Sequence, residues 1–161
     1  MKLALALLCV ASTAFAGDNS KSIGKLSITA PKDWNLAAKP QGITGESKDK
    51  EVALLVWSLD GNQDAAAAEK KLEGELYSAI ASIKWDAVTS GKAHDLSATY
   101  LSGQGHAKGG DIVVKASLVG PLAGANNAKT WMLVACAVHT DKLEAHKTEI
   151  QSIFDSVNHS K

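Results

Sequence analysis

Arginine is absent from this chain of 161 residues: all 17 basic residues are lysines, and 17 aspartates and glutamates balance them. A formal net charge of zero offers no basic excess to displace counterions from a phosphate backbone. Without arginine, the chain also lacks the planar group that contacts phosphate or guanine through two parallel hydrogen bonds. The composition therefore argues against a nucleic-acid partner. Hydrophobic residues at 45% and charged residues at 21% are instead typical of a globular domain.

Cysteine is scarce as well, and one of the two cysteines lies in an N-terminal segment that is typical of a secretory signal. Met1-Lys2 supplies a positive charge, Leu3 to Val10 is apolar, and Ala14-Phe15-Ala16 forms a cleavage motif. We expect residues 1–16 to be removed and the protein to be exported to a periplasm or to the exterior. Cys9 is lost with this segment.

Long hydrophobic runs are missing from the rest of the chain. A membrane-spanning helix needs about 20 apolar residues, and no later segment approaches that length. Cleavage after Ala16 would leave Cys136 alone, so no disulfide could form within the chain. The sequence thus predicts one domain over residues 17–161 that is stabilised by core burial.

Hydrophobic periodicity predicts the secondary structure. Strands are expected at 23–29, 43–47, 51–59, 96–105, 112–119 and 130–138. Helices are expected over 64–83, where Asp64 can cap the first turn, and over 141–157. Residues 17–22 are interpreted as a loose tail, 86–95 as a polar connection and 120–128 as a loop.

The order of these elements predicts the fold class. The strands at 51–59 and 130–138 are apolar on both faces, which is typical of strands covered on both sides. Most connections have the length of hairpins, so the sheet should be mainly antiparallel. Two helices must then cover two apolar faces. We therefore expect an α+β fold in which two helices enclose the sheet in an αβα sandwich.

Several local patterns accompany this order. Ala30-Pro31 and Trp34 follow the first strand, a glycine-rich hairpin lies at 103–110, and the final helix ends in Ile153-Phe154-Asp155-Ser156-Val157. Together they span residues 23–157 and resemble the PsbP/Mog-like family, in particular its DcrB-type exported bacterial members. The resemblance implies an αβα sandwich and an accessory or binding role rather than catalysis. It carries over no catalytic residues.

Histidines and acidic residues suggest one candidate metal site. His139 and Asp141 are two residues apart at the end of a strand, so both side chains could share a face and hold a divalent metal. His94 and His106 lie at loops or hairpin ends and could add ligands. The alternative is that all are solvated polar residues at element ends, and that no cofactor is bound. Cys136 lies in a doubly apolar strand and is interpreted as an inert core thiol.

Two of the four tryptophans suggest a binding groove. Trp34 and Trp85 are expected in connections, where they could line a groove for a partner or ligand. The alternative is packing at the edge of the core. Trp57 and Trp131 lie in the doubly apolar strands and are expected to pack under the helices.

The function is expected to be binding. The sequence contains no nucleophile elbow, zinc-protease motif or calcium loop. The glycines at 103–110 precede a strand rather than a helix, so they do not form a phosphate loop. The first interpretation is an exported, non-enzymatic accessory protein that binds an envelope partner through loops 30–42, 85–95 and 120–129. The second is a small-ligand or divalent-metal binding protein of the cell envelope.

Overall fold

An eight-stranded antiparallel sheet forms the centre of the computed structural model, which describes residues 19–123 and 128–160. The strand order is β3-β4-β5-β10-β9-β8-β6, and β7 also pairs with β8. The strands are β3 (Asn35–Lys39), β4 (Gly42–Glu46), β5 (Val52–Asp60), β6 (Ile80–Trp85), β7 (Thr89–Ala93), β8 (Leu96–Ala107), β9 (Gly110–Ala123) and β10 (Lys129–His139). The signal segment predicted at residues 1–16 lies outside the described residues.

Two helices and a small second sheet complete the structure. Helix α1 (Ala65–Leu76) follows β5, and a short 3₁₀ turn (Thr140–Lys142) leads from β10 into α2 (Leu143–Asp155). The small sheet joins β1 (Ser20–Ile23) and β2 (Leu26–Thr29) to β11 (Asn158–His159) near the C-terminus. Within the described ranges, none of the helices has the length and hydropathy needed to cross a bilayer.

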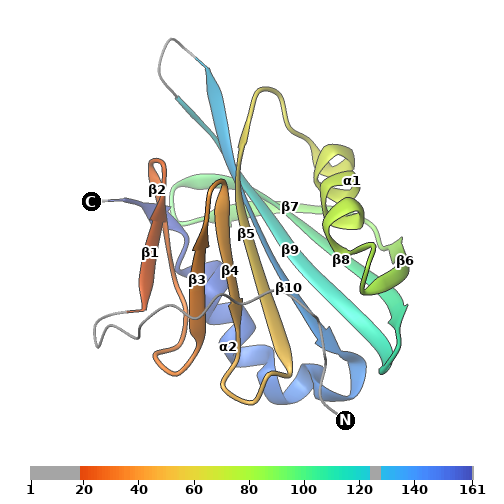
Figure 1. The fold of residues 1–161 in the computed structure, drawn as a ribbon. Helices are drawn as coiled ribbons and strands as arrows, with labels where there is room; N and C mark the ends of the chain where they lie inside the picture. Colours follow the sequence, from red (N-terminus) through yellow and green to blue (C-terminus); the bar gives the residue numbers. More distant parts are fainter. Residues whose placement is uncertain (1–18, 124–127, 161) are drawn as a thin grey trace.

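The large sheet separates two hydrophobic cores. On one face, α2 and β2 pack over alternate residues of β5 and β10, with Ile28, Val56, Val134 and Ile153 fully buried. On the other face, α1 covers the intervening residues, with Leu72 fully buried. Figure 1 shows α1 and α2 on opposite sides of the sheet. The double apolar character of β5 and β10 follows from this position, because each strand contributes side chains to both cores.

The predicted fold class is confirmed. The sheet pairings are antiparallel, and two helices enclose the sheet as expected. The predicted glycine-rich hairpin at 103–110 is present, since Ala107 pairs directly with Gly110. Trp57 and Trp131 pack against the core beneath α1, also as expected.

The predicted helix over 64–83 is wrong in its second half. Asp64 does cap α1, accepting a hydrogen bond from the Ala67 amide at 2.8 Å. The helix ends at Leu76, however, and residues 80–85 form β6 on the edge of the sheet. The apolar side chains of this segment pack into the core beneath α1 from an extended strand that pairs with β8. The β-branched residues Ile80 and Ile83 favour that extended conformation.

Strands also extend into segments expected as a tail, connections or loops, and one of them is β3, which lies within the expected loop 30–42. Residues 86–95 include β7, which turns back into β8 through His94 and Asp95, with His94 at a φ of 55°. The segment at 17–29 forms a β1–β2 hairpin rather than a tail and one strand, because Gly24 at a φ of 58° reverses the chain. Strand β9 continues to Ala123, so the loop expected at 120–128 begins later than predicted.

Candidate functional site

One histidine occupies a position where the helical pattern calls for an aliphatic residue. His146 lies on the buried stripe of α2 with Ile150 and Ile153, and its side chain is only 9% exposed. Its position four and seven residues before these neighbours places it on the face toward the sheet. A buried imidazole requires polar partners. They come from Glu149 on the same helix and from the turn between β4 and β5.

The β4–β5 turn holds two carboxylates against α2. The Ser47 side chain is buried, and its hydroxyl accepts hydrogen bonds from the backbone amides of Glu51 at 3.1 Å and Val52 at 3.0 Å. The same hydroxyl donates to Asp49 Oδ1 at 2.6 Å, and the Glu51 amide also donates to that oxygen at 3.1 Å. Lys50 takes a φ of 62° in this turn. These bonds define the positions of Asp49 and Glu51.

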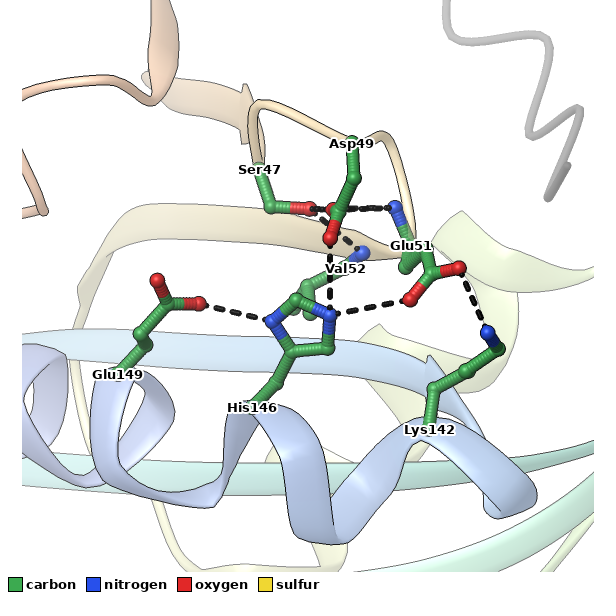
Figure 2. Close-up of polar contacts among 7 residues, drawn as sticks. All are labelled: Ser47, Asp49, Glu51, Val52, Lys142, His146 and Glu149. Atoms are coloured by element: carbon green, nitrogen blue, oxygen red, sulfur yellow. Dashed lines mark hydrogen bonds and ion pairs between the residues drawn. The ribbon is translucent and has the colours of Figure 1, made fainter.

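His146 is held between three carboxylates (Figure 2). Its Nδ1 lies 2.8 Å from Glu149 Oε2, on the same helix. Its Nε2 lies 3.2 Å from Asp49 Oδ2 and 3.2 Å from Glu51 Oε2, both in the turn. Lys142 reaches the other oxygen of Glu51 at 2.9 Å. We call Asp49, Glu51, His146 and Glu149, with Lys142, the acid–histidine cluster.

Electrostatics in the acid–histidine cluster favour the charged forms. Burial alone would lower the pKa of His146, but the hydrogen bonds to Glu149 and Glu51 and the charge of Asp49 outweigh it and raise the pKa. Lys142 and His146 lower the pKa of Glu51 through their hydrogen bonds. Burial opposes ionisation of Asp49, but its bonds to Ser47 and to the Glu51 amide leave its pKa lowered. Glu51 in turn raises the pKa of Lys142.

The cluster is accessible and has the composition of a cation site. A surface cavity is lined by Trp34, Lys48, Asp49, His146 and Glu149, among others. One ligand atom each from Asp49, Glu51 and His146 lie within 4.8 Å of one another. In the part of the chain that the structure describes, this is the one group of three or more histidine, cysteine or acidic side chains arranged to hold a metal ion.

The predicted metal residues lie apart from this cluster. His139 is buried at the end of β10, and its Nε2 has no hydrogen-bond partner among the described residues. Asp141 is exposed in the following 3₁₀ turn. Neither belongs to the group of three ligands, and a metal at His139 and Asp141 stays a prediction. His106 instead pairs with exposed Asp111 at 2.9 Å.

The two candidate groove tryptophans have different positions. Trp34 is 4% exposed and belongs to the core under α2, but it also lines the cavity beside His146. Trp85 lies at the end of β6 rather than in a connection, packs against the core under α1 and donates from Nε1 to Glu73 at 2.9 Å. Only Trp34 therefore lies next to the candidate site.

The sequence analysis did not identify the acid–histidine cluster, because Lys48-Asp49-Lys50 lies between the strands predicted at 43–47 and 51–59 and is typical of a charged hairpin tip. A usable signal was present in α2. In the helix predicted over 141–157, Leu143, Ile150 and Ile153 form an apolar stripe at helical spacing, and a histidine at position 146 interrupts it. Its partners could not be identified from spacing, because Glu51 lies 95 residues away along the chain.

Comparison with known proteins indicates the fold. The sequence matches no protein-family model, and no curated protein matches it significantly. Among solved structures, it is similar to cyanobacterial PsbP (CyanoP) from Synechocystis, with a TM-score of 0.63 and 9% identity over 94% of this chain and 99% of that one. LpqN, involved in cell envelope biogenesis of Mycobacterium tuberculosis, gives a TM-score of 0.57 and 15% identity over 89% and 86% of the chains.

The Ran-binding protein Mog1p of Saccharomyces cerevisiae is also similar, with a TM-score of 0.51 and 10% identity over 88% of this chain and 96% of that one. At these identities the likeness concerns the fold alone. It agrees with the architecture described above, in which two helices enclose a mainly antiparallel sheet. The chain thus has a PsbP/Mog-like α+β fold.

Proposed function

We propose that this chain is an exported, non-enzymatic binding protein whose ligand is a divalent cation held by the acid–histidine cluster. The observation that carries this proposal is the convergence of Asp49 and Glu51 on a single ring nitrogen of His146, at 3.2 Å each. Carboxylate oxygens and imidazole nitrogen are the ligands that many divalent metals take in proteins. The cavity beside the cluster provides a route of entry.

The charge of the cluster supports a divalent ion. Asp49, Glu51 and Glu149 contribute three negative charges, and Lys142 contributes one positive charge. With a neutral imidazole, two negative charges remain, and one divalent cation would neutralise them. A protonated His146 neutralises only one of the two. Clustered carboxylates with excess negative charge are a common property of cation sites.

Native mass spectrometry of the full chain with added Zn²⁺ or Mn²⁺ tests the cation. We expect one bound ion per chain, and we expect it to be lost in both His146→Gln and Asp49→Asn/Glu51→Gln. His106→Gln is the matched control, because His106 forms an exposed histidine–carboxylate pair elsewhere. Circular dichroism should show that each variant is folded. A wild-type protein that binds no ion, or variants that bind as well as wild type, would contradict the proposal.

Export is proposed from the sequence of residues 1–16. A positive start, an apolar run and the Ala14-Phe15-Ala16 motif are the three parts of a cleavable secretory signal. The intact mass of the protein isolated from the envelope of its host tests this. A mass matching residues 17–161 supports cleavage after Ala16, and a mass that retains residues 1–16 would contradict it.

A protein partner is the second candidate function. It is favoured by the likeness in fold to Ran-binding Mog1p and to LpqN, which is involved in cell envelope biogenesis. Under this proposal, the chain binds an envelope protein through one end of the sandwich and serves as an accessory subunit. A second protein that co-purifies stoichiometrically from the native envelope, with the cluster free of metal, would favour this function over cation binding.

A further inference from the structure

The two carboxylates of the β4–β5 turn each present a single oxygen to His146. Asp49 Oδ1 is held by the Ser47 hydroxyl at 2.6 Å and the Glu51 amide at 3.1 Å, so Oδ2 faces the imidazole. Glu51 Oε1 is held by Lys142 at 2.9 Å, so Oε2 faces the imidazole. Both carboxylates are therefore arranged to bind a cation through one oxygen.

Three single donors favour a small coordination number. Calcium takes about 6–8 oxygen ligands and often uses a carboxylate through both oxygens. Magnesium prefers oxygen ligands in an octahedron. The cluster instead offers two oxygens and one buried nitrogen, and three is the number of protein ligands in zinc sites that keep one position open. The cavity beside Asp49 and His146 lies where a fourth, exogenous ligand could enter.

The two donor distances from the imidazole agree with that coordination. Around a tetrahedral ion with bonds of about 2.0 Å, neighbouring donor atoms lie about 3.3 Å apart. Nε2 of His146 lies 3.2 Å from Asp49 Oδ2 and 3.2 Å from Glu51 Oε2.

Glu149 contacts the ring nitrogen of His146 that faces away from Asp49 and Glu51. Its Oε2 lies 2.8 Å from Nδ1 of His146. A carboxylate at this position accepts the Nδ1–H and keeps the lone pair of a neutral imidazole on Nε2, which is the nitrogen that faces Asp49 and Glu51. Such partners of metal-binding histidines set both the tautomer and the orientation of the ring.

We infer that the cluster selects a zinc-class transition ion, bound by Asp49 Oδ2, Glu51 Oε2 and His146 Nε2, with Glu149 as the positioning residue. This inference rests on the proposed cation-binding function and narrows it to a class of ion. Glu149 does not bind the ion in this arrangement; it accepts the Nδ1–H of His146 and orients the ring.

Titration of the full chain with Zn²⁺, Ca²⁺ and Mg²⁺ in separate calorimetric experiments tests the selectivity. We expect Zn²⁺ to bind at least about 100-fold more tightly than Ca²⁺ or Mg²⁺, because the nitrogen donor and the small donor number disfavour both. Equal affinity for Ca²⁺ or Mg²⁺ would overturn the inference but leave cation binding intact. Absence of any binding would overturn both.

Two substitutions of Glu149 test the positioning role. We expect Glu149→Ala to weaken Zn²⁺ binding by about 10–100-fold, and Glu149→Gln to weaken it less, because the amide oxygen can still accept from Nδ1. Glu144→Ala is the matched control on α2, since Glu144 pairs only with exposed Lys147 among the described contacts. Thermal unfolding verifies that the variants fold.

The ¹⁵N shifts of His146 give a readout that a merely structural role would not move. With Zn²⁺ bound, we expect the wild-type ring to be protonated at Nδ1 and ligated at Nε2. In Glu149→Ala, we expect the shift of Nδ1 to change as its acceptor is lost. Wild-type affinity and unchanged ring shifts in Glu149→Ala would overturn the role of Glu149.

Discussion

A single buried imidazole connects the last helix to a turn near the beginning of the chain. His146 has carboxylate partners on both ring nitrogens, from Glu149 on α2 and from Asp49 and Glu51 in the turn. Lys142 forms an ion pair with Glu51 and so also belongs to this group of charges. Because the imidazole is largely buried, its charge depends on these neighbours rather than on water.

The pH dependence of stability in the metal-free protein follows from the directions of these pKa shifts. Folding raises the pKa of His146 above its ordinary value of 6.5, so the resulting stabilisation is complete below that pH and is lost as pH rises through the raised pKa. Folding lowers the pKa values of Asp49 and Glu51, so their stabilisation is lost as pH falls through the lowered values. Maximum stability is expected between these limits.

Urea unfolding in EDTA at a series of pH values tests this. We expect the free energy of unfolding to decline above pH 6.5, by up to about 1.4 kcal/mol per unit of pKa difference. His146→Gln should flatten the decline, whereas the control His106→Gln should preserve it. An equal slope in wild type and His146→Gln would show that the cluster does not contribute to the pH dependence.

At the scale of elements, two glycines on β8 allow the edge strand β6 to pair closely with it. A Cβ on Gly105 would collide with the Ile80 side chain and would lie 2.5 Å from the Ser82 carbonyl oxygen. A Cβ on Gly103 would lie 2.7 Å from the Trp85 ring. The glycine-rich segment at 103–110, noted in the sequence for its resemblance to a family pattern, thus has a packing role on the edge of the sheet.

Two alanine substitutions should have opposite effects on stability. Gly105→Ala must displace backbone as well as side-chain atoms, and we expect it to lower the free energy of unfolding by about 1–3 kcal/mol. Gly74→Ala lies in the exposed part of α1 with nothing within 4 Å of the added Cβ, and we expect it to raise that free energy by about 0.5–1 kcal/mol. Denaturant midpoints measure both.

The opposite sign tests the packing argument directly. Equal destabilisation by Gly105→Ala and Gly74→Ala would indicate a general intolerance to side chains. A neutral Gly105→Ala would show that β6 can shift away from β8 without cost.

At the scale of the whole molecule, the large sheet separates the two hydrophobic cores, and its strands contribute side chains to each. Leu72 of α1 is fully buried on one face, and Ile153 of α2 is fully buried on the other. Their side chains belong to different core clusters, so they have no shared packing partner in the clusters, although β5 and β10 contribute to each.

Substitutions on the two faces should therefore be additive. We expect Leu72→Ala to cost about 2–5 kcal/mol and Ile153→Val about 0.5–1.5 kcal/mol. The double variant should equal the sum to within about 0.5 kcal/mol, because the sites share no partner. Chemical denaturation followed by tryptophan fluorescence and circular dichroism measures these values. Non-coincident transitions, or a clear departure from additivity, would contradict this description of the core.

The success of the fold prediction has a physical basis in the central strands. Strands β5 and β10 were predicted within a residue or two, because burial on both faces leaves a continuous apolar run. Edge elements were predicted poorly. Residues 80–85 retain apolar residues at spacings compatible with a helix, yet pairing with β8 makes them a strand.

The acid–histidine cluster was not among the site residues predicted from the sequence. His139 and Asp141 were chosen because they are neighbours in the sequence, and the structure places one in the core and the other on the surface. The acid–histidine cluster combines a turn and a helix that are 95 residues apart. Its only local signal is a histidine within an apolar stripe.

The amino-acid sequence by itself determined the class of fold, because hydrophobic periodicity records which face of each element is buried. It also determined the balanced charge and the short N-terminal motif on which export is proposed. Tertiary structure alone decided which polar side chains meet. Asp49, Glu51 and His146 come together because the β4–β5 turn lies against α2, and sequence spacing carries no measure of that distance.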